Sequence, residues 1–249
     1  MFKKIDDILV EYEFFEGEKQ HCIVFLHGFG GNLNNFSYFA KTFNNFGYST
    51  LNINLTDFGF KSLPKFFNIY NFAEVVFKLL KSLKIHSFTL IGHSFGGRIS
   101  IILSSMYNGV KNLVLVDSAG IKPRFSIKTK YKVIKYKAYK FLANKKIIKK
   151  DKLKKFGSSD YKNLSNNLKG VFNNIIQEDL TYLLKNIKCK TLIVFGSKDK
   201  DTPMYMAKKL HKCIIKSKLV IFKNAGHYCY VDESQKFINL VKSFLGENE

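Results

Sequence analysis

Short apolar runs rich in strand-forming residues recur along the chain, and segments with apolar residues at helical spacing lie between them. Runs of this kind are typical of strands that are buried on both faces of a parallel sheet. The alternation predicts an α/β fold, in which a mostly parallel central sheet is flanked by helices. The expected strands are residues 8–15, 21–26, 49–55, 87–91, 110–116, 191–195 and 218–222, and the expected helices are residues 35–46, 68–83, 98–107, 204–212 and 232–245.

This alternation stops at Gly120 and resumes at Thr191. The sequence between them contains no convincing strand, and its apolar residues recur at helical spacing. A helical insertion is therefore expected after strand 110–116. The ordinary interpretation of its apolar stripe is packing onto the main domain. The stripe consists of Tyr131, Ile134, Ala138, Phe141 and Leu142.

The insertion also carries much of the positive charge. The whole chain has a formal net charge of +22, and residues 122–155 hold 15 Lys and Arg side chains against the single acid Asp151. Such a segment can attract anionic substrates, nucleic acid or acidic lipid, or it can be a solvated helical face. The sequence favours the solvated face, and because no DNA- or RNA-binding motif accompanies the charge, no nucleic-acid partner is expected.

The most informative short motif is Gly92-His93-Ser94-Phe95-Gly96, which lies between an expected strand and an expected helix. A serine raised on so tight a turn has an unfavourable backbone conformation. Its neighbours two residues away on each side must be small, because the strand and the helix nearly touch there. The following helix directs backbone N–H groups towards negative charge near Ser94. The alternative is a serine in an ordinary strand–helix turn.

A second glycine-rich segment, His27-Gly28-Phe29-Gly30-Gly31-Asn32, follows strand 21–26. Glycines allow a sharp bend and leave amide N–H groups facing a cavity. A dinucleotide-binding loop is excluded, because Leu33 stands where the third glycine of that motif is needed, and the phosphate-loop signature is absent.

A nucleophilic serine requires a base to accept its proton and an anion to hold that base in the correct tautomer. His227 follows the last expected strand, and Asp199 follows the strand before it. Both would lie at the same sheet edge as Ser94. Asp201 and Asp117 are competing acids. Asp117 is expected to make structural hydrogen bonds.

Together these motifs resemble the α/β-hydrolase fold family, in which the triad follows the order Ser, Asp, His along the chain. The resemblance implies that Ser94, Asp199 and His227 are catalytic. Residues 196–203 resemble the family's G-x-x-D-x-x-x-P element, and the spacing of Asp199 from Gly196 and to Pro203 in that element favours Asp199 over Asp201. It also implies that the backbone N–H groups of Phe29 and Phe95 form an oxyanion hole. Finally, it implies a helical cap over residues 122–184, inserted in a core domain of residues 1–121 and 185–249.

Arg98 is a candidate substrate-binding residue, because the Gly96-Gly97-Arg98 string resembles a menaquinone-biosynthesis hydrolase in which an arginine here meets an anionic substrate. An ion pair with the main domain is the alternative. His27 and His93 each belong to a rigid glycine turn, and are therefore expected to bond the loops rather than act as bases.

The predicted protein is a serine hydrolase that cleaves small carboxylic esters through an acyl-enzyme on Ser94. One alternative is a C–C bond hydrolase or lyase acting on a small anionic carbonyl compound with the same triad. Others are a sensing protein with slow turnover and a basic nucleic-acid or membrane-surface binder. No cofactor or metal is expected. The sequence leaves the oligomeric state open.

The expected location is the cytoplasm. The four cysteines are scattered, which favours a reducing compartment. No signal peptide is seen at the N-terminus, and no apolar run approaches membrane-spanning length, so stable membrane insertion is not expected.

Overall fold

We analysed a computed structural model of the chain, in which residues 1–56, 58, 67–123, 127–145, 147–148 and 166–246 are described. An eight-stranded sheet has the strand order β1-β2-β4-β3-β5-β6-β7-β8. The pairs β1–β2 and β2–β4 are antiparallel, and all the pairs among β3 to β8 are parallel. The strands are β1 (Phe2–Ile5), β2 (Ile8–Phe15), β3 (Lys19–Leu26), β4 (Tyr48–Ile53), β5 (Phe88–His93), β6 (Val110–Val116), β7 (Lys190–Gly196) and β8 (Ser217–Phe222).

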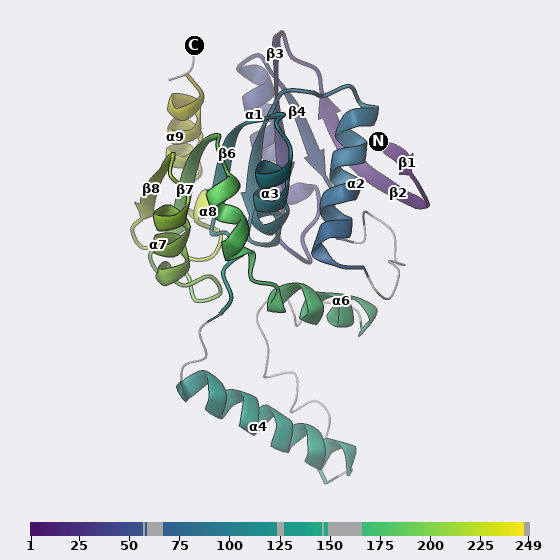
Figure 1. Cartoon of the computed structure of the whole chain (residues 1–249), viewed down its shortest axis with the longest axis vertical. Helices are drawn as coiled ribbons and strands as arrows, with labels where there is room; N and C mark the ends of the chain where they lie inside the picture. The colour runs from purple at the N-terminus through teal and green to yellow at the C-terminus, as the bar shows by residue number, and fades with distance from the viewer. Residues whose placement is uncertain (57, 59–66, 124–126, 146, 149–165, 247–249) are drawn as a thin grey trace.

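Helices cover both faces of the sheet (Figure 1). The helices are α1 (Asn34–Asn45), α2 (Ile69–Ser82), α3 (Phe95–Met106), α4 (Ile127–Asn144), α6 (Asn166–Gln177), the 3₁₀ helix η3 (Leu180–Asn186), α7 (Met204–Cys213), α8 (Cys229–Asp232) and α9 (Ser234–Gly246). Side chains of α1 and α9 share one buried cluster with Phe25, whereas those of α2, α3 and α7 share another with Val24 and Leu26. Successive residues of β3 thus point into different cores, which explains the continuous apolar runs.

The expected α/β fold is therefore confirmed, with one addition at the sheet edge. Residues 2–5 form β1, which pairs with β2 through a tight turn in which Asp6 has a φ of +50°. This strand could not be predicted from the sequence, because only Ile5 of its four residues is buried. An exposed edge strand of this length carries almost no hydrophobic pattern.

The insertion after β6 is helical in the part that the structure describes, namely α4, α6 and η3. Residues 124–126, 146 and 149–165 of the predicted cap lie outside the described residues, and the division into core and cap remains a prediction. The η3 segment packs into the core through Leu180 and Leu184. In contrast, α4 stands apart from the α/β body (Figure 1).

The ordinary interpretation of the apolar stripe of α4, packing onto the main domain, does not hold for three of its residues. Tyr131, Ile134 and Phe141 are 65%, 65% and 61% exposed. The stripe predicted the helix correctly. It could not predict what the helix packs against, because the spacing of apolar residues shows which side of a helix is apolar and not which other segment contacts that side.

Candidate active site

Ser94 lies between the end of β5 and the start of α3, with a φ of +50° and a ψ of −107°. A non-glycine residue held at such angles stores on the order of 1–3 kcal/mol of strain, which is typical of functional sites. The two flanking glycines are required by close contacts. A Cβ atom on Gly96 would lie 1.9 Å from the carbonyl oxygen of Leu26, and one on Gly92 would lie 2.6 Å from the carbonyl oxygen of Gly96. The expected crowding of strand and helix is therefore present.

The loop after β3 lies directly against this turn. The amide of Gly96 donates to the carbonyl of His27 at 3.1 Å, and a Cβ atom on Gly28 would lie 3.5 Å from the Cβ atom of Ser94. The rings of Phe29 and Phe95 are in edge-to-face contact, with centroids 4.9 Å apart. The structure thus brings together the two residues whose amides are the predicted oxyanion-hole donors.

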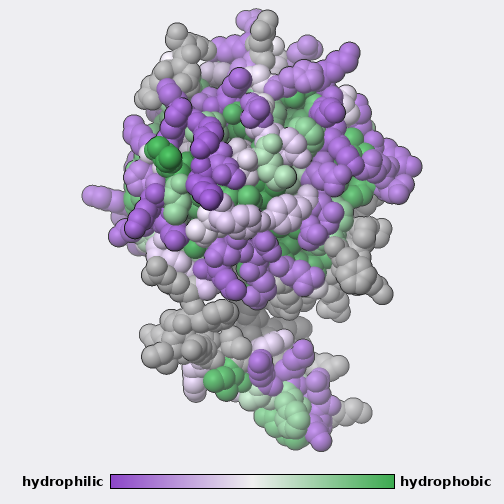
Figure 2. All heavy atoms as spheres, in the orientation of Figure 1, coloured by the Kyte–Doolittle hydropathy of each residue, from purple (hydrophilic) through white to green (hydrophobic). Residues whose placement is uncertain are grey.

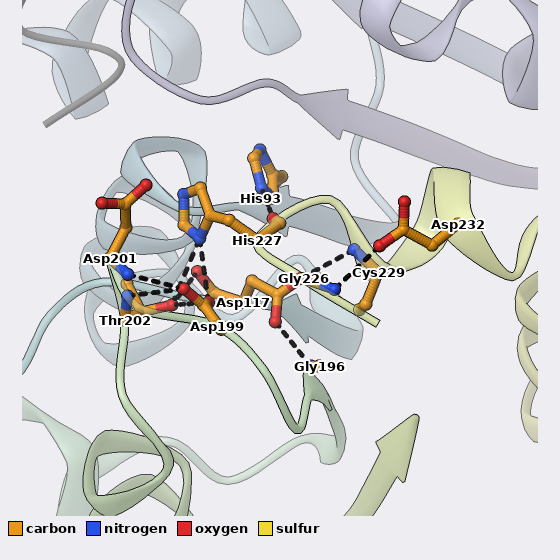
Figure 3. Close-up of polar contacts among 10 residues, drawn as sticks. All are labelled: His93, Asp117, Gly196, Asp199, Asp201, Thr202, Gly226, His227, Cys229 and Asp232. Atoms are coloured by element: carbon orange, nitrogen blue, oxygen red, sulfur yellow. Dashed lines mark hydrogen bonds and ion pairs between the residues drawn. The ribbon is translucent and has the colours of Figure 1, made fainter. Parts of the chain in front are cut away.

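Asp199 and His227 form a buried pair at the ends of β7 and β8. The Nδ1 atom of His227 lies 2.9 Å from Oδ2 of Asp199 (Figure 3). The other carboxylate oxygen, Oδ1, accepts hydrogen bonds from the amides of Asp201 at 2.8 Å and Thr202 at 2.9 Å. The competing acid Asp201 therefore contributes its backbone amide to the turn that holds Asp199 in place.

The two members of the pair shift each other's pKa. Burial by itself would lower the pKa of His227, but the hydrogen bond and the charge of Asp199 outweigh it, so the pKa is raised. Burial would raise the pKa of Asp199, yet the same interaction with His227 lowers it. Both shifts favour an ionised carboxylate beside an imidazole that readily accepts a proton.

The second ring nitrogen of His227, Nε2, is buried and has no hydrogen-bond partner among the described residues. Because Asp199 occupies Nδ1, Nε2 is the nitrogen that would exchange a proton with a reacting group. The ring centroids of His227 and His93 are 4.9 Å apart, which places His227 beside the residue that precedes Ser94.

Thr202 is a site residue that the sequence analysis did not identify. Its hydroxyl donates to Oδ2 of Asp199 at 2.5 Å and lies 3.0 Å from the carbonyl oxygen of Asp117 and 3.5 Å from Nδ1 of His227. A threonine three residues after an aspartate in a loop is a signal for such a turn, in which the side chain bonds locally.

Asp117 connects the ends of β6 and β7 to the start of α8. It has a φ of +41° and is fully buried after β6. Its Oδ1 accepts from the amide of Gly196 at 2.8 Å, and its Oδ2 from the amide of Cys229 at 3.0 Å (Figure 3). Burial raises its pKa to about 7 against these hydrogen bonds. The side chain thereby joins β6 to the end of β7 and to the segment just after His227, as its expected structural role requires.

Two other histidines bond the loops, as expected. The Nδ1 atom of His27 lies 2.7 Å from the carbonyl oxygen of Gly28, and its Nε2 accepts from the amide of Leu55 at 2.9 Å. The Nε2 atom of His93 lies 2.7 Å from the carbonyl oxygen of His227. Burial lowers the pKa of His27 to about 4 and that of His93 to about 3, so both rings are neutral at physiological pH.

Arg98 lies just inside α3 and is 3% exposed. Its guanidinium donates to the carbonyl of Glu178 at 2.8 Å and to that of Ile176 at 3.4 Å. Burial lowers its pKa to about 10, so it stays charged at neutral pH. These contacts tie α3 to the C-terminal end of α6, where a cation is favoured by the helix dipole. A contact with an anionic substrate remains a prediction.

The part of the chain that the structure describes contains no group of three or more His, Cys, Asp and Glu side chains that could hold a metal ion. The four cysteines, Cys22, Cys189, Cys213 and Cys229, are unpaired. None of the described helices is both long and apolar enough to cross a bilayer.

Comparisons with known proteins agree with this architecture. Residues 22–144 match a family model described as alpha/beta hydrolase fold, and residues 177–249 match one described as TAP-like protein. The AB hydrolase superfamily protein YisY of Bacillus subtilis (strain 168) is 27% identical over 244 residues, which cover 89% of this chain and 90% of that protein.

Solved structures share the fold over nearly the whole chain. The esterase EaEST from Exiguobacterium antarcticum superposes with a TM-score of 0.76 and 22% identity, covering 98% of each chain. The meta-cleavage product hydrolase from Pseudomonas fluorescens IP01 superposes with a TM-score of 0.72 and 19% identity, covering 98% of this chain and 96% of that one. These structures show a shared fold; the family models and the similarity to YisY show that the chain belongs to the α/β-hydrolase fold family and is an enzyme of the hydrolase type.

Proposed function

We propose that the protein is a serine hydrolase that cleaves small carboxylic esters, with Ser94 as nucleophile, His227 as general base and Asp199 as the residue that orients it. One observation carries the proposal. The Asp199–His227 pair leaves a buried Nε2 atom without a hydrogen-bond partner among the described residues, and the His227 ring centroid lies 4.9 Å from that of His93, the residue that precedes the strained Ser94. An imidazole held by a carboxylate, with its other nitrogen unbonded, supports nucleophilic catalysis by a serine on the neighbouring turn.

In the first half-reaction, Nε2 of His227 takes the proton of Ser94 as Oγ attacks the ester carbonyl carbon. The resulting oxyanion accepts hydrogen bonds from the amides of Phe29 and Phe95. The bond to the alkoxy group then breaks, and His227 donates its proton to the departing alcohol. Water repeats the sequence on the acyl-enzyme, releasing the carboxylic acid and restoring Ser94. Each oxyanion donor of this kind is worth about 3–4 kcal/mol of transition-state stabilisation.

The neighbouring residues support the charge changes that this mechanism requires. Asp199 stabilises the imidazolium, and the bonds that it accepts from Asp201 and Thr202 keep its carboxylate from rotating. Asp117 holds the segments on which Asp199 and His227 stand. Proton transfer therefore takes place between groups that are already positioned, which is the main source of rate in such sites.

A C–C bond hydrolase is the second candidate, because a meta-cleavage product hydrolase shares the fold with a TM-score of 0.72. The same triad can serve both reactions, and the fold does not decide between them. The strained backbone at Ser94 favours an enzyme over a sensing protein with slow turnover, because ligand binding alone does not require a strained serine. The unpaired cysteines support a reducing compartment, and we infer a cytoplasmic location.

The test is a panel of p-nitrophenyl esters with acyl chains of rising length, run beside a vinylogous diketone as the C–C substrate. A fluorophosphonate probe should label the wild-type protein and not the Ser94→Ala variant. Labelling with ester turnover supports the esterase. Labelling with turnover of the diketone alone supports the C–C hydrolase, and absence of both labelling and turnover would refute the enzyme mechanism.

A further inference from the structure

Helix α4 carries an apolar stripe that no described part of the molecule covers. Tyr131, Ile134 and Phe141 are each more than 60% exposed, and Ala138 between them is exposed as well. At about 100° per residue these four positions lie on one face of the helix. Exposed aromatic and large aliphatic side chains that form one contiguous face indicate an interaction surface, whereas scattered ones do not.

The opposite face of the same helix behaves differently. Ala143 is 3% exposed, and Tyr136 and Tyr139 are half-buried. The exposure of the helix is therefore uneven, and its most apolar side chains lie on the more exposed side. This arrangement is the reverse of an ordinary surface helix, which buries its apolar stripe.

Lysines accompany the exposed stripe. α4 contains six lysines and no acidic residue, and Lys135, Lys137 and Lys140 are exposed. Just beyond its C-terminus, the ammonium group of Lys145 lies 5.7 Å from the ring centroid of Phe141. Hydrophilic and hydrophobic residues thus lie side by side on the lobe that α4 forms, well away from the α/β body (Figure 2).

We propose that α4 docks on an anionic membrane surface, with the stripe of Tyr131, Ile134, Ala138 and Phe141 inserted at the headgroup level and the lysines paired with acidic headgroups. An apolar face with flanking lysines is the composition of helices that lie in the plane of the interface. Long lysine side chains can extend their ammonium groups to the headgroups while their methylene groups lie against apolar surface.

The positive charge and the apolar stripe of α4 together favour an anionic membrane over a second copy of the chain or a nucleic acid. A second copy of the chain would place two lysine-rich helices against each other, and their repulsion would oppose the contact. A nucleic acid would satisfy the lysines but leave the aliphatic part of the stripe unused, because its phosphates and bases offer no hydrocarbon. An anionic bilayer satisfies both features of the helix. It also leaves the site at Ser94 unaffected, so the inference does not depend on the proposed reaction.

Vesicle sedimentation with the full-length protein tests the inference. The protein should pellet with vesicles of phosphatidylcholine mixed with phosphatidylserine, much less with vesicles of phosphatidylcholine alone, and less as salt is raised. Replacing Lys135, Lys137 and Lys140 with glutamine should weaken partitioning on the order of 100-fold, since each lysine near an anionic surface contributes about fivefold. The triple variant Tyr131→Ser, Ile134→Ser, Phe141→Ser should lose at least as much, on the order of 100-fold.

Matched variants control for charge and for exposed apolar area elsewhere. Replacing Lys208, Lys212 and Lys216 with glutamine removes the same charge from another exposed surface, and Ile215→Ser removes an isoleucine that is 85% exposed. Both should partition like the wild type. The stripe variant should keep the wild-type thermal unfolding temperature, because it changes exposed side chains. Ser94→Ala should also partition like the wild type, which separates this test from that of the proposed enzyme.

Three results would overturn the inference. The first is no pelleting with the anionic vesicles, or pelleting that both α4 variants retain. The second is tighter binding to polyuridylate than to the vesicles with no effect of the stripe variant, which would assign the helix to nucleic acid. The third is a dimer in light scattering that the stripe variant dissociates, which would assign the stripe to a second copy of the chain.

Discussion

Replacing Asp199 with asparagine tests the acid of the proposed triad with the least change of shape. In the wild type, Oδ1 of Asp199 accepts from the amides of Asp201 and Thr202, and an asparagine Oδ1 can keep both bonds. The new Nδ2 group would replace Oδ2, which lies 2.9 Å from Nδ1 of His227. Being a donor, it would bond to an unprotonated Nδ1 and drive the ring proton onto Nε2.

The consequence is a base whose working nitrogen is already protonated. The negative charge that stabilises the imidazolium is also lost. In a serine protease the same substitution lowered kcat about 10⁴-fold, and a loss of that size corresponds to about 5 kcal/mol of transition-state stabilisation. We expect a loss of similar order here. The fold should survive. The hydroxyl oxygen of Thr202 can accept a hydrogen bond from Nδ2 of the asparagine, and the hydroxyl proton can be donated to the carbonyl oxygen of Asp117.

The assay is the steady-state hydrolysis of whichever p-nitrophenyl ester the wild type cleaves fastest, with Asp201→Asn as the matched control on the same turn. The control should retain activity within about tenfold, because Asp201 contributes its amide to Asp199 and the substitution keeps that amide. A loss of activity smaller than tenfold in Asp199→Asn would refute this assignment of the acid. A loss of more than tenfold in Asp201→Asn would refute it as well.

Three further predictions concern the nucleophile, its turn and the base. Ser94→Ala should abolish ester hydrolysis and keep a cooperative thermal transition; near-wild-type turnover would remove Ser94 from the mechanism. Gly96→Ala should abolish activity and lower the unfolding temperature, because its Cβ would lie 1.9 Å from the carbonyl oxygen of Leu26, whereas Gly170→Ala, with open space around it, should do neither. Because the pKa of His227 is raised above 6.5 and its neutral form is the base, kcat/KM should fall as pH is lowered through that raised pKa. A pH profile with an inflection well below 6.5 would contradict the coupling to Asp199.

The sequence by itself determined the layers of this protein and the order along the chain of the residues proposed for its site. Strands buried on both faces must be apolar throughout, and so β3 and β5 to β7 could be read from composition alone. The turn at Ser94 requires glycines at positions 92 and 96, because only a missing Cβ lets the helix approach the strand so closely. The resemblance of residues 196–203 to the family's motif favoured Asp199 over Asp201, and Asp199 is the acid whose side chain contacts His227.

Other features were decided only by the tertiary structure, because they depend on contacts between segments far apart in the sequence. Nothing local to Asp117 indicates that its two oxygens accept from Gly196 and Cys229. Likewise, the hydrogen bonds from Arg98 to the carbonyls of Ile176, in the last turn of α6, and of Glu178, just after it, join residues 78 and 80 positions apart.

Helix α4 gives the clearest contrast. Its periodicity specified a helix with an apolar face, and that much was correct. Whether the face is buried depends on where the chain places the helix relative to the body, and this placement leaves Tyr131, Ile134 and Phe141 in contact with solvent. A hydrophobic stripe identifies the side chains whose burial would be favourable. Only the tertiary structure determines whether another segment of the same molecule buries them.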